Sequence, residues 1–144
     1  MTVTLDANVL LYASDTRSPF HERALTLVAE LAAGRELLYL FWPTVMAYVR
    51  IATHPSVFAE PLAPKIAIGN VERLLELPHV QTAGERERFW DVFRGVAEES
   101  DARGNLVPDA RLVALMEQNG VRTIWTRDRD FRRFRGIDAR DPFV

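Results

Sequence analysis

Residues 37–42 read Leu-Leu-Tyr-Leu-Phe-Trp, an unbroken apolar run in the first third of the chain. A strand with one face in water alternates polar and apolar side chains, whereas a strand covered on both faces does not. The run therefore predicts a strand of a parallel sheet, buried between two layers of helices. Further strands are expected at residues 3–5, 79–83 and 121–126, and an edge strand at 137–140.

Segments with the 3.6-residue spacing of helices lie between these strands. We expect a helix from Ser18, as its cap, to Gly34, and another that starts at Pro43 and Thr44 and stops before Pro55. Further helices are expected at residues 64–77, 85–99 and 108–120. The apolar stripes of the first and third helices include Leu25 and Ile68, respectively. Alternating strands and helices predict one three-layer α/β domain, residues 1–144, with a mostly parallel sheet.

Composition fits a cytosolic globular protein. The 144 residues are 48% hydrophobic and 26% charged, and they include no cysteine, which excludes disulfides and thiolate metal sites. No apolar run approaches the roughly 20 residues that span a bilayer. The N-terminus lacks the basic segment of a signal peptide. We therefore expect a cytoplasmic protein without membrane association.

Arginine is concentrated near the C-terminus. The net charge of −2 argues against a general nucleic-acid coat, but residues 122–140 hold seven arginines and three aspartates. Lys65 is the only lysine, so a GC-rich genome is an alternative explanation of the arginine preference. Four of these arginines could contact phosphates or form a solvated face: Arg127, Arg129, Arg132 and Arg133.

Aspartates follow two predicted strands at the edge where ligands bind in parallel α/β folds. Asp6 comes directly after the first strand, and Asp128 and Asp130 follow the strand near residue 125. Asp109 lies in the first turn of the helix that Pro108 opens. Each alone could be a turn former or a helix cap. Together they suggest a cluster of carboxylates from remote parts of the chain.

Such a cluster calls for a cation. Two carboxylates about 4 Å apart repel by roughly 4 kcal/mol at an effective dielectric constant near 20. Oxygen ligands suit Mg²⁺ or Mn²⁺, whereas His21, His54 and His79 show no zinc-ligand spacing. A carboxylate-held Mg²⁺ is suited to phosphodiester hydrolysis. The fingerprints of Walker loops, dinucleotide sites and α/β-hydrolase elbows are absent from the sequence.

The chain resembles PIN-domain proteins and, among them, VapC-type toxin ribonucleases of type II toxin–antitoxin systems, over nearly its whole length. Four segments carry the resemblance: LDANVLLYA at 5–13, RIATHP at 50–55, GNLVPDA at 104–110 and TRDRDF at 126–131. Any one of them is a weak signal. All four in this order and at these spacings are fairly specific.

The resemblance implies a parallel sheet of about five strands and Mg²⁺- or Mn²⁺-dependent endonucleolytic cleavage of RNA. By this likeness Asp6 and Asp109 are the principal metal ligands, Asp128 completes the acidic cluster, and Asp130 assists indirectly or as a weaker ligand. Two further residues match positions that orient these carboxylates by hydrogen bonds: Asn8 and Thr126.

The resemblance also implies partners. Such toxins are neutralised by a VapB-type antitoxin, and they often form homodimers. Five aromatic residues are candidates for an exposed groove that accepts an antitoxin helix, with burial in the core as the alternative for each: Phe20, Trp42, Tyr48, Trp90 and Phe143.

One position departs from the family pattern. PIN nucleases usually carry a glutamate three residues before the arginine of the RIATHP segment, and here that position is Ala47. One carboxylate fewer favours a single Mg²⁺ that keeps several waters. It also leaves an alternative, a catalytically weakened PIN-fold protein that binds RNA or antitoxin. A relative of DNA flap nucleases is disfavoured, because the chain lacks the additional helices with which those enzymes clamp DNA.

Overall fold

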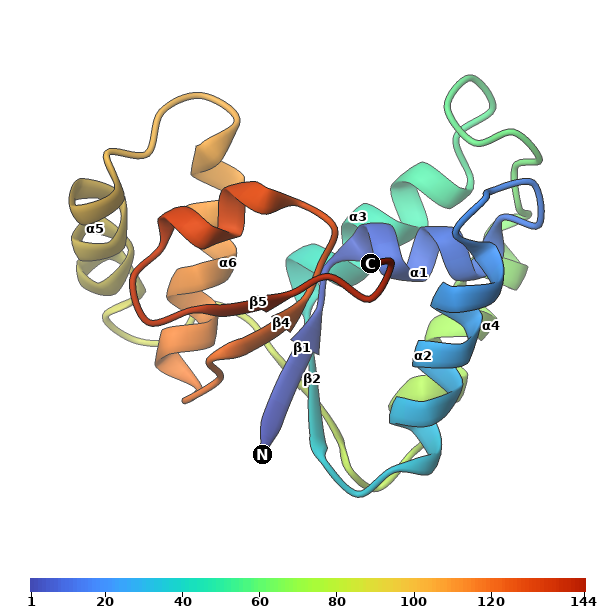
Figure 1. The fold of residues 1–144 in the computed structure, drawn as a ribbon, viewed down its shortest axis with the longest axis horizontal. Coiled ribbons are helices and arrows are strands. Elements are labelled where there is room, and N and C mark those ends of the chain that lie inside the picture. Colours follow the sequence, from blue (N-terminus) through green and yellow to red (C-terminus); the bar gives the residue numbers. More distant parts are fainter.

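The computed structural model describes all residues 1–144, and its centre is one parallel sheet of five strands in the order β3-β2-β1-β4-β5 (Figure 1). Every neighbouring pair of strands is parallel, which confirms the expected sheet. β5 lies at an edge, as expected. The strands are β1 (Thr2–Leu5), β2 (Leu37–Phe41), β3 (Val80–Ala83), β4 (Thr123–Trp125) and β5 (Asp138–Arg140).

Helices cover both faces of the sheet, which gives the expected three layers (Figure 1). One apolar cluster joins the sheet to α1 (Ala7–Ser14), α2 (His21–Ala33), α3 (Trp42–Ala52) and α4 (Pro64–Leu75). A second cluster joins it to α5 (Phe89–Ser100), α6 (Leu106–Gln118) and the 3₁₀ helix η1 (Arg129–Arg133). None of the helices has the length and apolar character that crossing a bilayer requires.

The register of the strands brings their carboxyl ends to one edge. Leu5 pairs with Trp125, and Phe41 pairs with Ala83, so these strands end at matching levels. Just beyond that level, the Asp6 N–H donates to the Trp125 carbonyl over 3.0 Å. The Thr126 N–H likewise donates to the Arg140 carbonyl over 2.9 Å, so the residues after β1 and β4 are each held by the backbone of a neighbouring strand.

Several helix boundaries differ from the prediction. α5, expected from residue 85, begins at Phe89, and α4 ends at Leu75 rather than at residue 77. Ser18 does not cap α2: its Oγ accepts the N–H of Phe20, which closes a turn, and the helix begins at His21. α6 begins at Leu106, so that Pro108 lies inside the first turn. A proline is tolerated there because the first N–H groups of a helix have no partner within the helix.

The prediction also missed α1 and the 3₁₀ helix η1, and it misplaced three apolar side chains. α1 follows β1 at once, and three consecutive residues are buried: Val9, Leu10 and Leu11. Such a run carries no helical periodicity, so the segment gave no recognisable signal. Trp42, expected at the end of a strand, is instead the first residue of α3. Leu25 and Ile68, expected in the buried stripes, are 49% and 46% exposed.

Candidate metal centre

Asp6 occupies the junction between β1 and α1. Its extended backbone makes it the N-cap of α1, where the Asn8 backbone N–H donates to Asp6 Oδ1 over 3.4 Å. Its other oxygen, Oδ2, accepts a hydrogen bond of 2.8 Å from the Thr126 hydroxyl. The carboxylate is thus held from both sides at the carboxyl edge of the sheet.

A chain of hydrogen bonds continues from Thr126 into η1. The buried Thr126 Oγ1 also accepts the backbone N–H of Asp128 over 2.9 Å. Asp128 is the N-cap of η1, and its Oδ1 accepts the N–H of Asp130 over 2.9 Å. Three acidic residues are therefore placed by one threonine and one short turn that follow β4.

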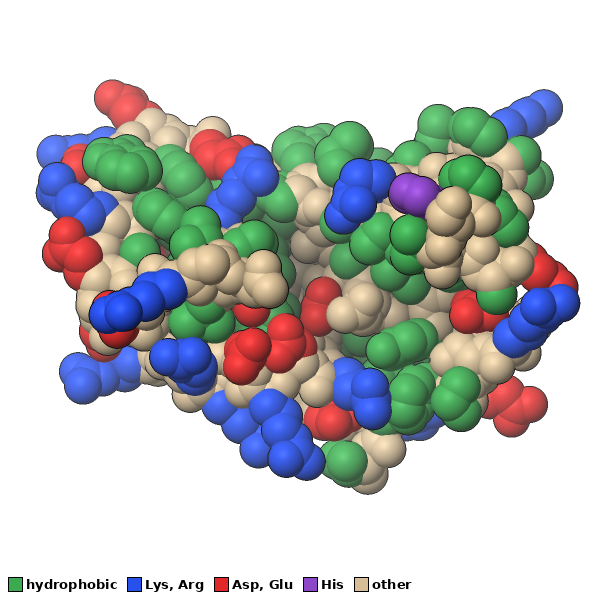
Figure 2. Space-filling view, turned by 90° about the horizontal axis from the view of Figure 1, so that it is seen from above, with side chains coloured by type: hydrophobic (Ala, Val, Ile, Leu, Met, Phe, Trp, Pro, Cys, Tyr) green, Lys and Arg blue, Asp and Glu red, His purple; other side chains and the backbone are tan.

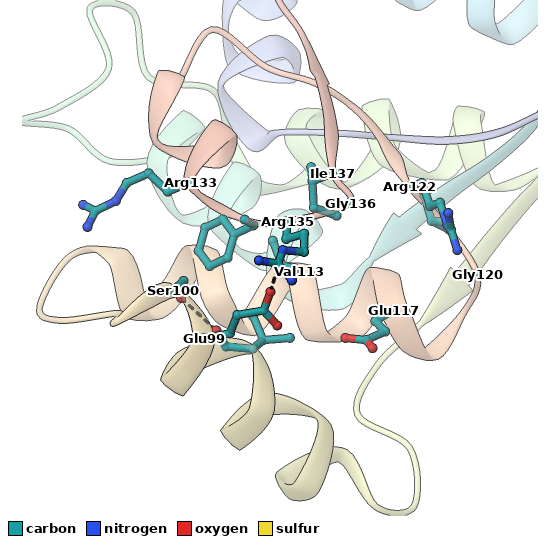
Figure 3. A pocket seen from close by; sticks show the side chains of 13 residues that line it. Glu99, Ser100, Val113, Glu117, Gly120, Arg122, Arg133, Arg135, Gly136 and Ile137 are labelled. Carbon is teal, nitrogen blue, oxygen red and sulfur yellow. Dashed lines mark hydrogen bonds and ion pairs between the residues drawn. The ribbon is translucent and has the colours of Figure 1, made fainter.

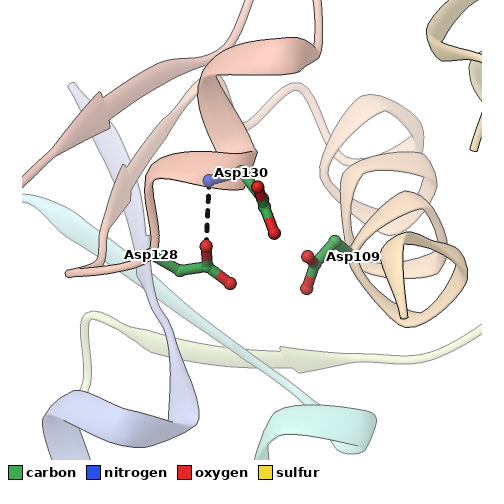
Figure 4. A group of neighbouring side chains, drawn as sticks. All are labelled: Asp109, Asp128 and Asp130. Carbon is green, nitrogen blue, oxygen red and sulfur yellow. Dashed lines mark hydrogen bonds between the residues drawn. The ribbon is translucent and has the colours of Figure 1, made fainter.

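Asp109 meets this turn from the first turn of α6. Asp109, Asp128 and Asp130 each offer an oxygen atom, and these atoms lie within 4.8 Å of one another. Figure 4 shows the three carboxylates directed into a common space between α6 and η1. Asp6 is not a member of this group of three but is close enough for its charge to act on Asp109.

The raised pKa values of Asp109 and Asp6 show that the ionised forms of these carboxyl groups are disfavoured where they lie. Burial, as the larger cause, and the charges of Asp128, Asp6 and Asp130 together raise the pKa of Asp109 to about 7. Burial also raises the pKa of Asp6, against the lowering effect of the hydrogen bonds from Thr126 and the backbone. Both shifts mean that negative charge at this edge lacks a compensating cation within the protein.

The donor set fits a hard divalent cation. The group of three offers carboxylate oxygens alone, and neither histidine nor a sulfur ligand takes part. Mg²⁺ and Mn²⁺ prefer oxygen ligands, and a cation would remove the repulsion that raises the pKa of Asp109. The structure thus supports an acidic site for a divalent ion and does not select the ion.

The structure brings all four predicted aspartates to this edge but ranks them differently from the sequence. Asp130, expected to assist, belongs to the close group, whereas Asp6 lies beside it. Of the two supporting residues, Thr126 contacts Asp6 through its hydroxyl, but Asn8 does so only through its backbone N–H. Asp130 could have been ranked higher from the Asp-x-Asp spacing, because a capping aspartate accepts the N–H two residues on.

The position of the missing family glutamate lies on α3. Ala47 is half-buried in that helix, and no glutamate takes the place of its carboxylate in the group of three. The shortage expected from the sequence therefore persists in the folded chain. Seen from above, the face that carries the strand ends is hollowed between two lobes, with acidic side chains beside the hollow (Figure 2).

Basic side chains border the acidic group. Arg127 lies over the Phe20 ring, 4.4 Å from its centroid, so this guanidinium already has a cation–π partner. The others of the four candidates are exposed and have no carboxylate within 4.0 Å: Arg129, Arg132 and Arg133. These three remain available to an anionic ligand.

The five aromatic candidates for a docking groove divide in the structure. Tyr48 is buried, and its hydroxyl is hydrogen-bonded to Ser14 and Asn70. Phe20 and Phe143 pack against each other with ring centroids 4.9 Å apart. Trp42 and Trp90 are 41% and 65% exposed, so only these two present large apolar surfaces to solvent.

Comparisons with known proteins agree with this geometry. The family model described as "PIN domain" matches residues 3–137. Ribonuclease VapC48 of Mycobacterium tuberculosis is 51% identical over 143 residues, with 99% of each chain covered. Ribonuclease VapC43 of the same species is 36% identical over 138 residues, covering 96% of this chain and 93% of that protein.

Solved structures show the same fold at low sequence identity. VapC20 of M. tuberculosis, described as a sarcin-ricin loop cleaving toxin, superposes with a TM-score of 0.67 at 14% identity, covering 90% of this chain and 92% of that one. VapBC2 of Rickettsia felis, bound to a DNA fragment from its promoter, gives a TM-score of 0.68 at 12% identity, with 97% and 98% coverage.

Proposed function

The chain belongs to the PIN-domain family, and from this premise we propose that it is the toxin endoribonuclease of a VapBC-type toxin–antitoxin pair. The identity of 51% to a named VapC ribonuclease, over 99% of both chains, is the observation that carries this conclusion. The acidic group at the carboxyl edge of the sheet supplies the chemistry that the family name requires. The proposal treats residues 1–144 as one PIN domain in the cytoplasm, where cellular RNA is found.

We place Mg²⁺, with Mn²⁺ as a substitute, among four carboxylates. The family pattern makes Asp6 and Asp109 the principal ligands, with Asp128 completing the site. The geometry groups Asp109 with Asp128 and Asp130, and Asp6 is close enough for its charge to act on Asp109. Mg²⁺ keeps several of its waters and needs few protein ligands, so one ion fits a site without the family glutamate. A bound divalent cation there polarises a phosphate and lowers the pKa of an attacking water.

The protein's own residues position the reaction. The Thr126 hydroxyl donates to Asp6 Oδ2, and Asp128 Oδ1 accepts the N–H of Asp130. These carboxylates are therefore already oriented before a metal ion binds. Arg129 and Arg132 extend from η1 beside the acidic group and are free to contact neighbouring phosphates of the RNA. Their charge also offsets the repulsion that a polyanion meets on approaching carboxylates.

The test uses the chain purified free of any partner. Single-stranded RNA with Mg²⁺ should be cleaved internally, EDTA should abolish cleavage, and Asp6→Asn should remove it. Equal cleavage by the wild type and by Asp6→Asn would exclude Asp6 from the mechanism and point to a contaminating nuclease. The control Asp91→Asn alters an exposed aspartate of α5 and should cleave as the wild type does.

Ala47 favours one second candidate, a protein that binds RNA or antitoxin without turnover. The same experiment separates the two, because this candidate predicts RNA binding without any metal-dependent product. An RNA-binding chain that yields no fragments at saturating Mg²⁺ or Mn²⁺ would establish it.

The proposed partners are a VapB-type antitoxin, the RNA substrate and a second copy of the chain. Solved relatives include the antitoxin-containing pairs VapBC2 and FitAB. The exposed Trp42, Met46 and Trp90 offer the apolar surface that protein partners bury. A basic antitoxin segment that enters the acidic site would block metal binding, so inhibition should be competitive with Mg²⁺.

A further inference from the structure

A second cavity lies away from the four aspartates. It has a volume of about 520 Å³ and opens between the C-terminal parts of α5 and α6, the start of β4 and the segment that links η1 to β5. None of the four aspartates of the proposed metal centre lines it. Figure 3 shows charged side chains from several of these elements around the opening.

The charges of this cavity are mixed and only partly paired. Arg135 is paired with Glu99 over 3.3 Å. Arg122 and Arg133 have no carboxylate within 4.0 Å, and they lie at opposite ends of the group in Figure 3. Glu117 makes neither an ion pair nor a side-chain hydrogen bond and lies between them. The cavity therefore offers two free guanidinium groups and one free carboxylate.

Its wall is apolar. Val113, Val121 and Phe134 are buried in the second apolar cluster and also line the cavity, together with the half-buried Ile137. A planar ring could lie against such a surface while its polar edge meets the charged groups at the rim.

This combination selects the class of ligand. A simple anion would be repelled by the free carboxylate of Glu117, and a metal ion would be repelled by the two free arginines. A nucleotide carries both kinds of complementary group, because its phosphate pairs with guanidinium groups and the amino group of its base donates to a carboxylate. Bases of single-stranded RNA are typically splayed out and recognised on such edges.

The 3₁₀ helix η1 links the proposed metal centre to the cavity along the chain. Asp130 at the start of this helix belongs to the acidic group, and Arg133 at its end lines the cavity. A 3₁₀ helix rises about 2 Å per residue, so the two positions are about 6 Å apart along its axis. Arg129 and Arg132, free of ion pairs, lie on the same turn, so a strand leaving the acidic group meets positive charge on its way.

We propose that this cavity binds one nucleotide of the RNA substrate close to the cleaved bond, with the phosphates on its two sides held by Arg122 and Arg133, its base against Phe134 and the amino group of the base on Glu117. The inference rests on the proposed ribonuclease function and adds to it a site that selects sequence. Bases with an exocyclic amino group are preferred over uracil, which has none.

The phosphate contacts are tested by RNA binding in EDTA, where no cleavage occurs. Arg122→Ala and Arg133→Ala should each weaken binding of a random-sequence single-stranded RNA. Each should also reduce the slope of log affinity against log salt by about 0.7, the value for one phosphate contact on a single strand. Arg94→Ala removes an exposed arginine of α5 that does not line the cavity and should change neither quantity.

The base contact is tested with two nucleotides that differ at one group. Cytidine 5′-monophosphate carries the amino group and uridine 5′-monophosphate lacks it, so titration in EDTA should show tighter binding of the cytidine nucleotide. Glu117→Gln should abolish the difference, whereas Glu98→Gln, a neighbouring exposed glutamate outside the cavity, should retain it. With Mg²⁺, sequencing of cut ends from a random RNA pool should show a preference at one position near the cut, lost about fivefold or more in Glu117→Gln.

The two proposals fail in different ways. Arg122, Arg133 and Glu117 are exposed, so their variants should melt with the wild type and report on binding alone. Unchanged affinity, salt slope and nucleotide preference in these variants would overturn the cavity proposal without affecting the proposed ribonuclease function. A wild type that does not cut RNA in Mg²⁺ or Mn²⁺ would instead overturn the ribonuclease.

Discussion

The hydroxyl of Thr126 donates a hydrogen bond of 2.8 Å to Asp6 Oδ2, although the two residues are 120 positions apart in the sequence. They meet because β1 and β4 are neighbours in the sheet and each residue directly follows its strand. The same hydroxyl accepts the N–H of Asp128, so one buried oxygen aligns the two sides of the acidic site.

Thr126→Val should therefore lower metal affinity and RNA cleavage by about 10- to 100-fold, the usual effect of removing a group that orients a metal ligand. Valine has the same shape and lacks the hydrogen bond to Asp6 Oδ2. Thr126→Ser retains the hydroxyl and should stay close to the wild type. The measurement is the cleavage rate as a function of Mg²⁺ concentration, and equal curves for Val and Ser would refute an orienting role.

Asp109 should make the stability of the metal-free protein depend on pH. Its pKa is raised to about 7 in the folded chain, while an unfolded aspartate titrates near 3.9. The folded state thus binds this proton more tightly, and its stabilising effect, complete below about pH 4, is lost as the pH rises to about 7. Asp6, whose pKa is also raised, acts in the same direction.

Thermal melts in EDTA between pH 4 and 8 test this effect as the difference between the wild type and Asp109→Asn. The wild type should lose stability relative to the variant over this range and level off above about pH 7. A difference that stays constant with pH would mean that Asp109 is not buried among like charges in solution.

Asp128→Asn should raise the melting temperature of the metal-free protein. The substitution removes one of the charges that repel each other, and the amide oxygen can still accept the N–H of Asp130 and cap η1. Mg²⁺ at 100 times its dissociation constant should stabilise the wild type by about 2.7 kcal/mol and the variant by less. Differential scanning calorimetry with and without Mg²⁺ measures both, and a clear fall in EDTA would make Asp128 a structural cap.

Ala47→Glu should restore the carboxylate that PIN nucleases usually carry in the second turn of α3. We expect half-maximal cleavage at a lower Mg²⁺ concentration, because one more ligand is offered to the ion. In EDTA the variant should melt below the wild type if the family position faces the acidic group, since it then adds a negative charge to a site that already repels one. Ala47→Gln, which is similar in size and uncharged, is the control and should show neither effect.

Much of the fold could be predicted from local patterns. The apolar run at 37–42 indicated a strand buried on both faces, and alternating strands and helices indicated three layers around a parallel sheet. α1 escaped prediction because Val9, Leu10 and Leu11 are all buried and leave no polar face to mark a helix. Ile68 was misplaced because helical spacing shows that residues share a face without showing how far the neighbouring elements cover it.

The sequence predicted which aspartates form the acidic site, but it predicted less well how they are arranged within it. Asp6 and Asp128 follow strands and Asp109 starts a helix, so a parallel sheet must bring them to one edge. The close grouping of Asp130 depends on the 3₁₀ turn that Asp128 caps, and Arg127 is held by Phe20 from a distant helix junction. Neither contact has a signal in the local sequence.

The sequence by itself determined which segments become strands and helices and which carboxylates stand at their ends, because periodicity and capping act over a few residues. Only the tertiary structure decided that β1 lies between β2 and β4, that Thr126 therefore reaches Asp6, and that η1 links an acidic group to a cavity whose charges are only partly paired. Strand order is selected by how the helices pack on the two faces of the sheet, an energy summed over the whole chain rather than contained in any one segment.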